Sequence, residues 1–180
     1  MGETGFSGGE VQVFLLMEGL RRHHYHNLLV CPRGSVSEER ARHLGFDVCA
    51  ISFRPEWSPL RVWEIWRELR AIGPDILHLH TGRANWIGGL AAWQLGLPAI
   101  TTRRMDRPVK RNLRTRILYG ECVRRAVAIS HSVGRQLVAA GVPETMTRVV
   151  RSAVDPNALH PLRGRDATRA ALFPRSARPI

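Results

Sequence analysis

The sequence has almost no lysine, few cysteines and no long apolar run. Lys110 is the single lysine among its 27 basic residues, so arginine carries nearly all of the formal net charge of +12. Cys31, Cys49 and Cys122 are scattered and form no Cys-x-x-Cys pair, which excludes a zinc knuckle and a disulfide framework. No window approaches the roughly 18 apolar residues of a membrane span, and no signal-peptide pattern begins the chain. We therefore expect a protein of the reducing cytoplasm, in contact with a membrane only peripherally, on its inner face.

The length and charge limit the kinds of partner. With 180 residues, of which 44% are hydrophobic, the chain is long enough for one domain with a real core. The positive charge favours anionic partners, and the planar arginine side chain suits diphosphates in particular. Arginine enrichment that follows genome composition is the alternative explanation. Nucleic acid is disfavoured as a partner, because neither a recognition helix nor an aromatic stacking pattern is present.

Helical and strand patterns alternate along the chain. The hydrophobic spacing and the turn residues predict helices at 11–22, 37–44, 58–72, 84–95, 112–124 and 132–140. Short apolar strands are predicted at 27–31, 47–53, 76–80, 98–102, 127–130 and 147–150. Ser37 is the expected cap of the second helix, and Ser130 that of the last one. Alternation at this spacing predicts an α/β domain over residues 1–155, with a parallel sheet covered by helices on both faces, and a linker or tail without a clear element over 156–180.

A glycine-rich turn opens the first helix. Gly8 and Gly9 stand where the backbone can approach a diphosphate closely, and a helix N-terminus attracts anions. No strand pattern precedes this turn, although such turns normally follow a parallel strand. The alternative is a plain flexible turn before a helix.

His78 and His80 share one face of a predicted strand, because they lie two residues apart. His80 stands at the carboxyl end of the strand, the edge at which open α/β sheets bind ligands. An imidazole there can bind a sugar or polarise a reacting centre, although a histidine that is merely hydrogen-bonded into the sheet edge is the alternative. A metal site is disfavoured, since no third ligand has supporting spacing.

Arg103, Arg104 and Asp106 follow the next strand at the same edge. Their guanidinium groups suit an anionic acceptor, and Asp106 either binds sugar hydroxyls or pairs with one of the arginines. The basic segment 107–116 either rests on an anionic membrane or forms a solvated helix face.

Six pieces of sequence occur in a recognisable order. They are GGE at the first helix, PDILHLHTGRANWIG, GLPAITTRR, VRRAVAISHSV, LVAAGVPETMTRVV and RSAVDPNALHP. Together they resemble the N-terminal half of family-4 retaining glycosyltransferases of the GT-B architecture. The resemblance covers roughly residues 6–161 and implies a Rossmann-like, doubly wound domain.

The resemblance also implies a function. In this family two Rossmann-like domains face each other, the first holding the acceptor and the second most of a nucleotide-diphosphate sugar, with no cofactor beyond this co-substrate and no metal. It places Gly8 and Gly9 at the donor phosphates, His80 at the reacting sugar, and Arg103, Arg104, Asp106 and Trp86 at the acceptor. The acceptor would be a glycan or a lipid-linked molecule of the cell envelope.

The sequence departs from the family pattern in three places. The first strand is absent, the C-terminal domain with its Glu-x7-Glu donor motif is absent, and Ala153 replaces the usual glycine before Val154 and Asp155. We therefore expect a gap at the centre of the sheet, and a chain that is inactive alone or completed by a donor domain on another chain. The alternative is a noncatalytic glycan- or phospholipid-binding module, or a gene remnant.

Overall fold

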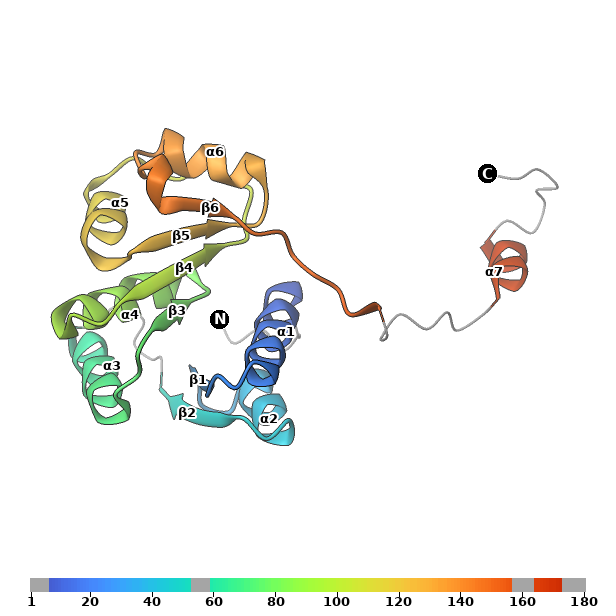
Figure 1. The fold of residues 1–180 in the computed structure, drawn as a ribbon, viewed down its shortest axis with the longest axis horizontal. Coiled ribbons are helices and arrows are strands. Elements are labelled where there is room, and N and C mark those ends of the chain that lie inside the picture. The colour runs from blue at the N-terminus through green and yellow to red at the C-terminus, as the bar shows by residue number, and fades with distance from the viewer. Residues whose placement is uncertain (1–6, 53–58, 157–163, 173–180) are drawn as a thin grey trace.

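The computed structural model describes residues 7–52, 59–156 and 164–172. The helices are α1 (Gly8–Arg22), α2 (Val36–His43), α3 (Pro59–Ile72), α4 (Gly82–Leu95), α5 (Leu113–Ile117), η1 (Leu118–Cys122), α6 (His131–Ala139), η2 (Glu144–Met146) and α7 (Arg165–Leu172). The strands are β1 (Leu28–Pro32), β2 (Asp47–Ile51), β3 (Leu77–Leu79), β4 (Ala99–Arg103), β5 (Arg125–Ala128) and β6 (Thr147–Val149). Helices and strands alternate from α1 to β6, and all strand pairs among the described residues are parallel (Figure 1). The predicted α/β fold is confirmed.

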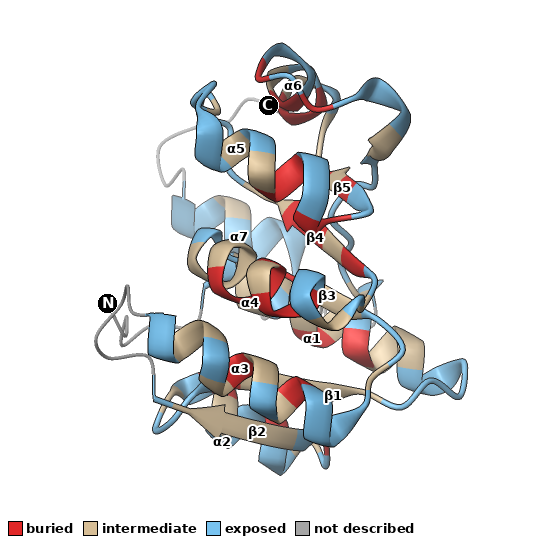
Figure 2. Cartoon of the chain, turned by 90° about the vertical axis from the view of Figure 1, so that its left-hand side faces the viewer, coloured by how far each residue is buried: buried red, intermediate tan, exposed pale blue. Residues whose placement is uncertain are grey.

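The described strands form two sheets instead of one. β1 pairs with β2, and the other four strands follow in the order β3-β4-β5-β6. β1 lies between β2 and β3 in both views of the chain, yet the described part of the structure has no pairing between β1 and β3 (Figure 1, Figure 2). A doubly wound sheet has its first strand at this central place. The expected gap at the centre of the sheet is therefore present.

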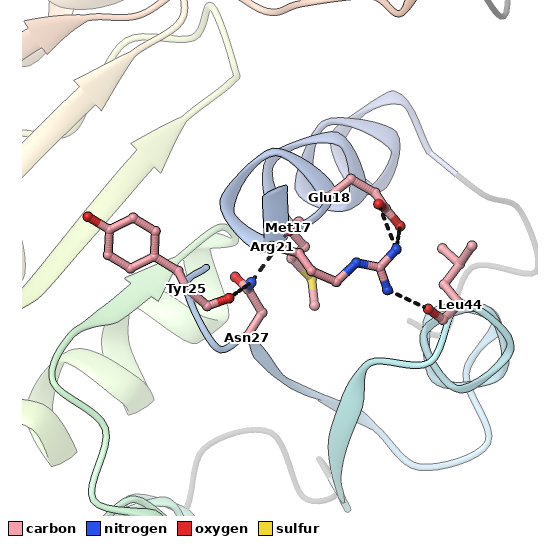
Figure 3. Close-up of polar contacts among 6 residues, drawn as sticks. All are labelled: Met17, Glu18, Arg21, Tyr25, Asn27 and Leu44. Atoms are coloured by element: carbon pink, nitrogen blue, oxygen red, sulfur yellow. Dashed lines mark hydrogen bonds and ion pairs between the residues drawn. The ribbon is translucent and has the colours of Figure 1, made fainter. Parts of the chain in front are cut away.

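Polar contacts fasten the C-terminal end of α1 to the β1–β2 pair. Arg21 forms an ion pair with Glu18 at 2.8 Å and donates a hydrogen bond to the carbonyl of Leu44 at 2.9 Å (Figure 3). The side-chain amide of Asn27, just before β1, donates a hydrogen bond to the backbone carbonyl of Met17 at 3.4 Å. An apolar cluster lies beneath these contacts, with the buried side chains Phe14, Met17, Ala41 and Phe46. α1 is thus held by α2 and the first sheet.

The largest core lies on the second sheet. α4, η1 and α6 cover β3, β4 and β5 with twelve buried residues, which run from Leu79 to Val142. Gly88 and Gly89 allow α4 to approach β3 closely, because a Cβ atom on Gly88 would lie 2.8 Å from Cδ2 of Leu79. A third cluster joins α3 to α4 through Ile65, Leu69, Ile87 and Ala91. This packing fixes the carboxyl ends of β3 and β4.

Several element boundaries differ from the prediction. Ser35, and not Ser37, caps α2, and Ser37 instead lies buried and donates a hydrogen bond to Glu10. The predicted helix 112–124 consists of α5 followed by a π-turn, η1. The fifth strand, β5, begins and ends two residues earlier than expected. Ser130 caps α6, as predicted.

The segment after β6 contains a helix that the sequence pattern did not predict. α7 spans Arg165–Leu172 and has no buried residue. Apolar spacing predicts helices that pack one face against a core, so it did not predict this one. The last residue of the strand expected at 47–53 lies outside the described residues. None of the described helices is long and apolar enough to cross a bilayer.

Candidate functional site

The two histidines of β3 lie against each other, as their spacing predicted. The ring centroids of His78 and His80 are 4.0 Å apart, with the planes tilted by 35°. Nε2 of His78 is 2.7 Å from Oγ1 of Thr102, which is buried on the neighbouring strand β4. His78 is therefore held by the sheet, and the next residue on the same face is His80 at the carboxyl end of the strand.

Arg104 joins His80 at this edge. It follows the last residue of β4, and its Nη1 lies 3.1 Å from Nδ1 of His80. Its aliphatic stem lies below the first turn of α1, because a Cβ atom on Gly9 would be 3.7 Å from Cδ of Arg104. The structure thus brings together three of the predicted site residues, His80, Arg104 and Gly9, from three separate elements.

A capping box fixes the N-terminus of α1 beside Arg104. The amide of Glu10 donates to Oγ of Ser7, and the Glu10 carboxylate accepts from the Ser7 amide at 2.8 Å. Burial acts to raise the pKa of Glu10, but hydrogen bonds from Ser37 and Ser7 outweigh it, and the pKa is lowered. These bonds use Ser7 and Glu10, so the amides of Gly8 and Gly9 are the remaining donors of the first turn.

Burial keeps both histidines neutral. Burial, His78 and Arg104 together lower the pKa of His80 to about 3. Burial and then the charge of Arg104 lower the pKa of His78 to about 4. Burial also lowers the pKa of Arg104. At neutral pH the site therefore contains one positive charge, two neutral imidazoles and a helix N-terminus, an arrangement suited to an anionic or hydroxyl-bearing ligand.

Arg103 and Asp106 face other neighbours. Arg103 donates to the carbonyl of Arg107, and its charge acts on the buried Tyr119. Asp106 accepts hydrogen bonds from Ser132 and Gln136 of α6. These bonds tie the loop after β4 to α6, and within the described residues Asp106 forms no ion pair with an arginine. Neither Ser132 nor Gln136 carried a sequence signal for this contact.

Trp86 belongs to a different surface. It lines a groove of about 460 Å³ between α3 and α4, together with Pro59, Val62, Trp63, Ile87, Leu90 and Gln94. The guanidinium of Arg114 lies 4.9 Å from the centroid of the Trp86 ring. Trp63 is 53% exposed. Trp66, by contrast, is partly buried and packs against the cluster between α3 and α4.

The chain leaving β6 returns to α1. Nε2 of Gln12 donates to the carbonyl of Ala153 at 2.7 Å, and the amide of Ala153 donates to Oε1 of Gln12 at 2.9 Å. Among the described residues His24 is the single non-glycine residue with positive φ, so Ala153 needs no glycine conformation. No group of three histidine, cysteine or acidic side chains within the described ranges could hold a metal ion.

A family match agrees with this arrangement. The sequence profile of Glycosyltransferase Family 4 matches residues 6–158. The chain belongs to glycosyltransferase family 4. The resemblance seen in the sequence motifs is thereby confirmed.

Solved glycosyltransferases share the fold of this family-4 chain. A glycosyltransferase from Rickettsia africae is similar with a TM-score of 0.75 at 15% identity, over 98% of this chain and 49% of that one. HepE of Anabaena, solved with UDP and glucose, gives 0.71 at 16% identity, over 96% and 48%. MurG of Acinetobacter baumannii gives 0.63 at 14% identity, over 88% and 46%. The chain corresponds to about half of each GT-B enzyme.

One curated relative shares a short, more similar stretch. The UDP-N-acetylglucosamine–N-acetylmuramyl-(pentapeptide) pyrophosphoryl-undecaprenol N-acetylglucosamine transferase of Salmonella arizonae is 43% identical over 47 residues. These residues are 24% of this chain and 13% of the relative. The family-4 chain therefore spans a small part of this relative and about half of the solved enzymes.

Proposed function

We propose that this domain is the acceptor side of a retaining glycosyltransferase that moves a sugar from a nucleotide diphosphate to a hydroxyl group. One observation carries the proposal: His80, Arg104 and the first turn of α1 meet at the carboxyl edge of the sheet. HepE, which shares the fold, was solved with UDP and glucose. A nucleotide diphosphate as partner fits the cation and the helix N-terminus of this site.

The roles within the site follow from its chemistry. The amides of Gly8 and Gly9 and the charge of Arg104 would bind the diphosphate that leaves during transfer. His80 would hydrogen-bond the sugar. Catalysis of this kind rests on positioning and on stabilisation of the leaving diphosphate, and needs neither a metal nor a pair of carboxylates. Since the chain spans about half of the solved enzymes, we expect the 180-residue chain alone to show no turnover. Detectable sugar transfer by the purified chain would contradict this expectation.

Binding of UDP and of pyrophosphate tests the α1 site directly. NMR titration of the labelled chain should shift the amide signals of Gly8, Gly9 and Glu10. The Gly8→Pro variant removes one amide donor at a helix position where proline is well tolerated, and should weaken binding. Gly8→Ala keeps the amide and is the matched control. Equal affinities in both variants, or shifts confined to other parts of the chain, would overturn the proposal.

We also propose that the face formed by α3, α4 and α5 rests on an anionic membrane, where a lipid-linked acceptor would be found. Figure 2 shows these three helices side by side on one face. Leu60, Trp63 and Leu113 are more than half exposed on them, and Arg114 lies beside Trp86. Apolar side chains among cations are the pattern of a peripheral membrane surface.

Vesicle sedimentation tests the membrane surface separately. Vesicles with anionic lipid should retain the chain at low salt, and zwitterionic vesicles should retain much less. The double variant Leu60→Ser/Trp63→Ser should lose binding, whereas Tyr25→Ser, an equally exposed change between α1 and β1, should not. Binding that is the same for both vesicle types, or unaffected by the double variant, would contradict a role for this face.

A further inference from the structure

The hydrogen bond between Arg104 and His80 determines where the imidazole carries its proton. Nη1 of Arg104 is 3.1 Å from Nδ1 of His80. A guanidinium group has five N–H donors and no acceptor. Nδ1 of His80 must therefore present its lone pair to Arg104, which leaves the ring proton on Nε2.

We propose that Arg104 is a positioning residue that holds His80 in its Nε2–H tautomer, so that the imidazole offers a single hydrogen-bond donor at the carboxyl edge of the sheet. The family resemblance implies that Arg104 contacts the acceptor directly. The geometry assigns it a role through His80 as well. Only the identity of the group that accepts from Nε2, a sugar oxygen, rests on the proposed glycosyltransferase function.

Packing of the Arg104 stem and burial of its Nε hold the guanidinium in this position. The aliphatic stem of Arg104 lies under Gly9. A Cβ atom at position 9 would be 3.7 Å from Cδ of Arg104. Nε of Arg104 is fully buried and has no hydrogen-bond partner among the described residues. Since the stem is packed and Nε is shielded from solvent, Nη1 is directed at His80 and cannot turn freely into solvent.

The second histidine, His78, packs against the ring of His80. The ring of His78 lies 4.0 Å from the ring of His80 and is itself bonded to Thr102. Burial disfavours protonation of His80 most; a proton on His78 would disfavour it further, and so does the charge of Arg104. His80 thus serves as a neutral donor of a hydrogen bond across the physiological range, and not as a residue that gains and loses a proton in each turnover.

NMR of the full chain with 15N-labelled histidine tests this inference without any ligand. The two-bond and three-bond nitrogen–proton correlations of the ring distinguish the tautomers, and His80→Gln assigns the signals. We expect a single neutral Nε2–H form of His80 between pH 5 and pH 8. A wild-type His80 that is charged, or that carries its proton on Nδ1, would overturn the inference outright.

Two arginine variants separate positioning from a general structural effect. Arg104→Met keeps the length of the stem but removes the donor, so His80 should become a mixture of tautomers and should titrate at a higher pH. Arg104→Lys should restore the Nε2–H form in part. Arg103→Met is the matched control, because Arg103 bonds to the carbonyl of Arg107 and not to His80, and it should leave the ring signals unchanged.

The result for Arg104→Met decides whether the arginine sets the tautomer of His80. If Arg104→Met leaves the tautomer unchanged while the amide spectrum shows an intact fold, the inference is wrong. If Arg104→Met does not fold, the wild-type tautomer and the lysine variant decide. Failure of UDP to bind would count against the proposed function alone, since the tautomer is measured in the unliganded protein.

Discussion

The side chain of Gln12 makes both backbone hydrogen bonds of Ala153, 141 residues further along the chain. The amide group of Gln12 acts like a neighbouring strand, as it donates to the carbonyl and accepts from the N–H of one residue. The contact connects the segment after β6 to α1, one turn beyond Gly8 and Gly9. Because Ala153 has no positive φ, alanine fits at position 153, where the family usually has glycine.

Removal of this contact should release the segment after β6. Gln12→Ala loses both bonds, so hydrogen exchange at the Ala153 amide should accelerate about fivefold, as expected for a bond worth about 1 kcal/mol. Gln12→Glu keeps the acceptor but loses the donor, and should show an intermediate rate. Gln94→Ala, a change at an exposed site on α4, is the control. Equal exchange rates in all four proteins would show that the contact does not hold the segment in solution.

Replacement by alanine should change stability in opposite directions at Gly88, where α4 packs closely on β3, and at Gly19, which has open space on α1. Gly88→Ala should destabilise the fold by about 1–3 kcal/mol, because its Cβ would lie 2.8 Å from the buried Leu79 side chain. Gly19→Ala has open space in α1 and should stabilise by up to about 1 kcal/mol through helix propensity. Urea unfolding of both variants checks the sign. A stable Gly88→Ala protein would show that α4 can move away from the sheet.

Local patterns in the sequence predicted most of the fold. Each strand, and each helix up to α6, follows from apolar spacing and turn residues, which act over a few positions, whereas the short helix η2 was not predicted. The shared face of His78 and His80 follows from the two-residue period of a strand. The break between β1 and β3 was also foreseeable, because α1 begins without a strand pattern before it.

The sequence did not predict which arginine joins His80. Arg103 and Arg104 are adjacent, and neighbouring side chains on extended backbone point to opposite faces. Which of the two faces His80 therefore depends on which side chains of β4 point to which face of the sheet. The apolar pattern of a strand that is covered on both faces does not reveal this. The contacts of Asp106 and Trp86 depend in the same way on the path of a loop and on the rotation of α4.

Asp106 should contribute to stability and not to binding of a diphosphate. Asp106→Ala removes the acceptor for Ser132 and Gln136, so the free energy of unfolding should fall by about 1 kcal/mol. Asp106→Asn keeps one acceptor oxygen and should lose less. Pyrophosphate binding, measured by the same NMR titration as for α1, should be unchanged in both variants. A variant with normal stability and no binding would return Asp106 to the ligand site.

The two half-buried histidines, His78 and His80, should make stability depend on pH in a defined direction. Their folded pKa values are about 3 for His80 and about 4 for His78, below the ordinary value of 6.5. Between pH 6.5 and these lower pKa values, the two histidines bind protons in the unfolded chain but not in the folded chain. The stabilisation is therefore complete above pH 6.5 and is lost as the pH falls toward 4 and then 3. Each histidine adds a slope of up to about 1.4 kcal/mol per pH unit.

Urea unfolding between pH 7 and pH 5 isolates this effect, because in that range carboxyl groups remain largely ionised in both states. The slope should become shallower in His78→Gln and in His80→Gln, and shallower still in the double variant. Arg104→Met should act in the same direction on the His80 contribution, since it removes a positive charge that opposes protonation. A free energy of unfolding that stays level from pH 6.5 to pH 5, or a double variant with the full wild-type slope, would show that the histidines are not buried as neutral groups.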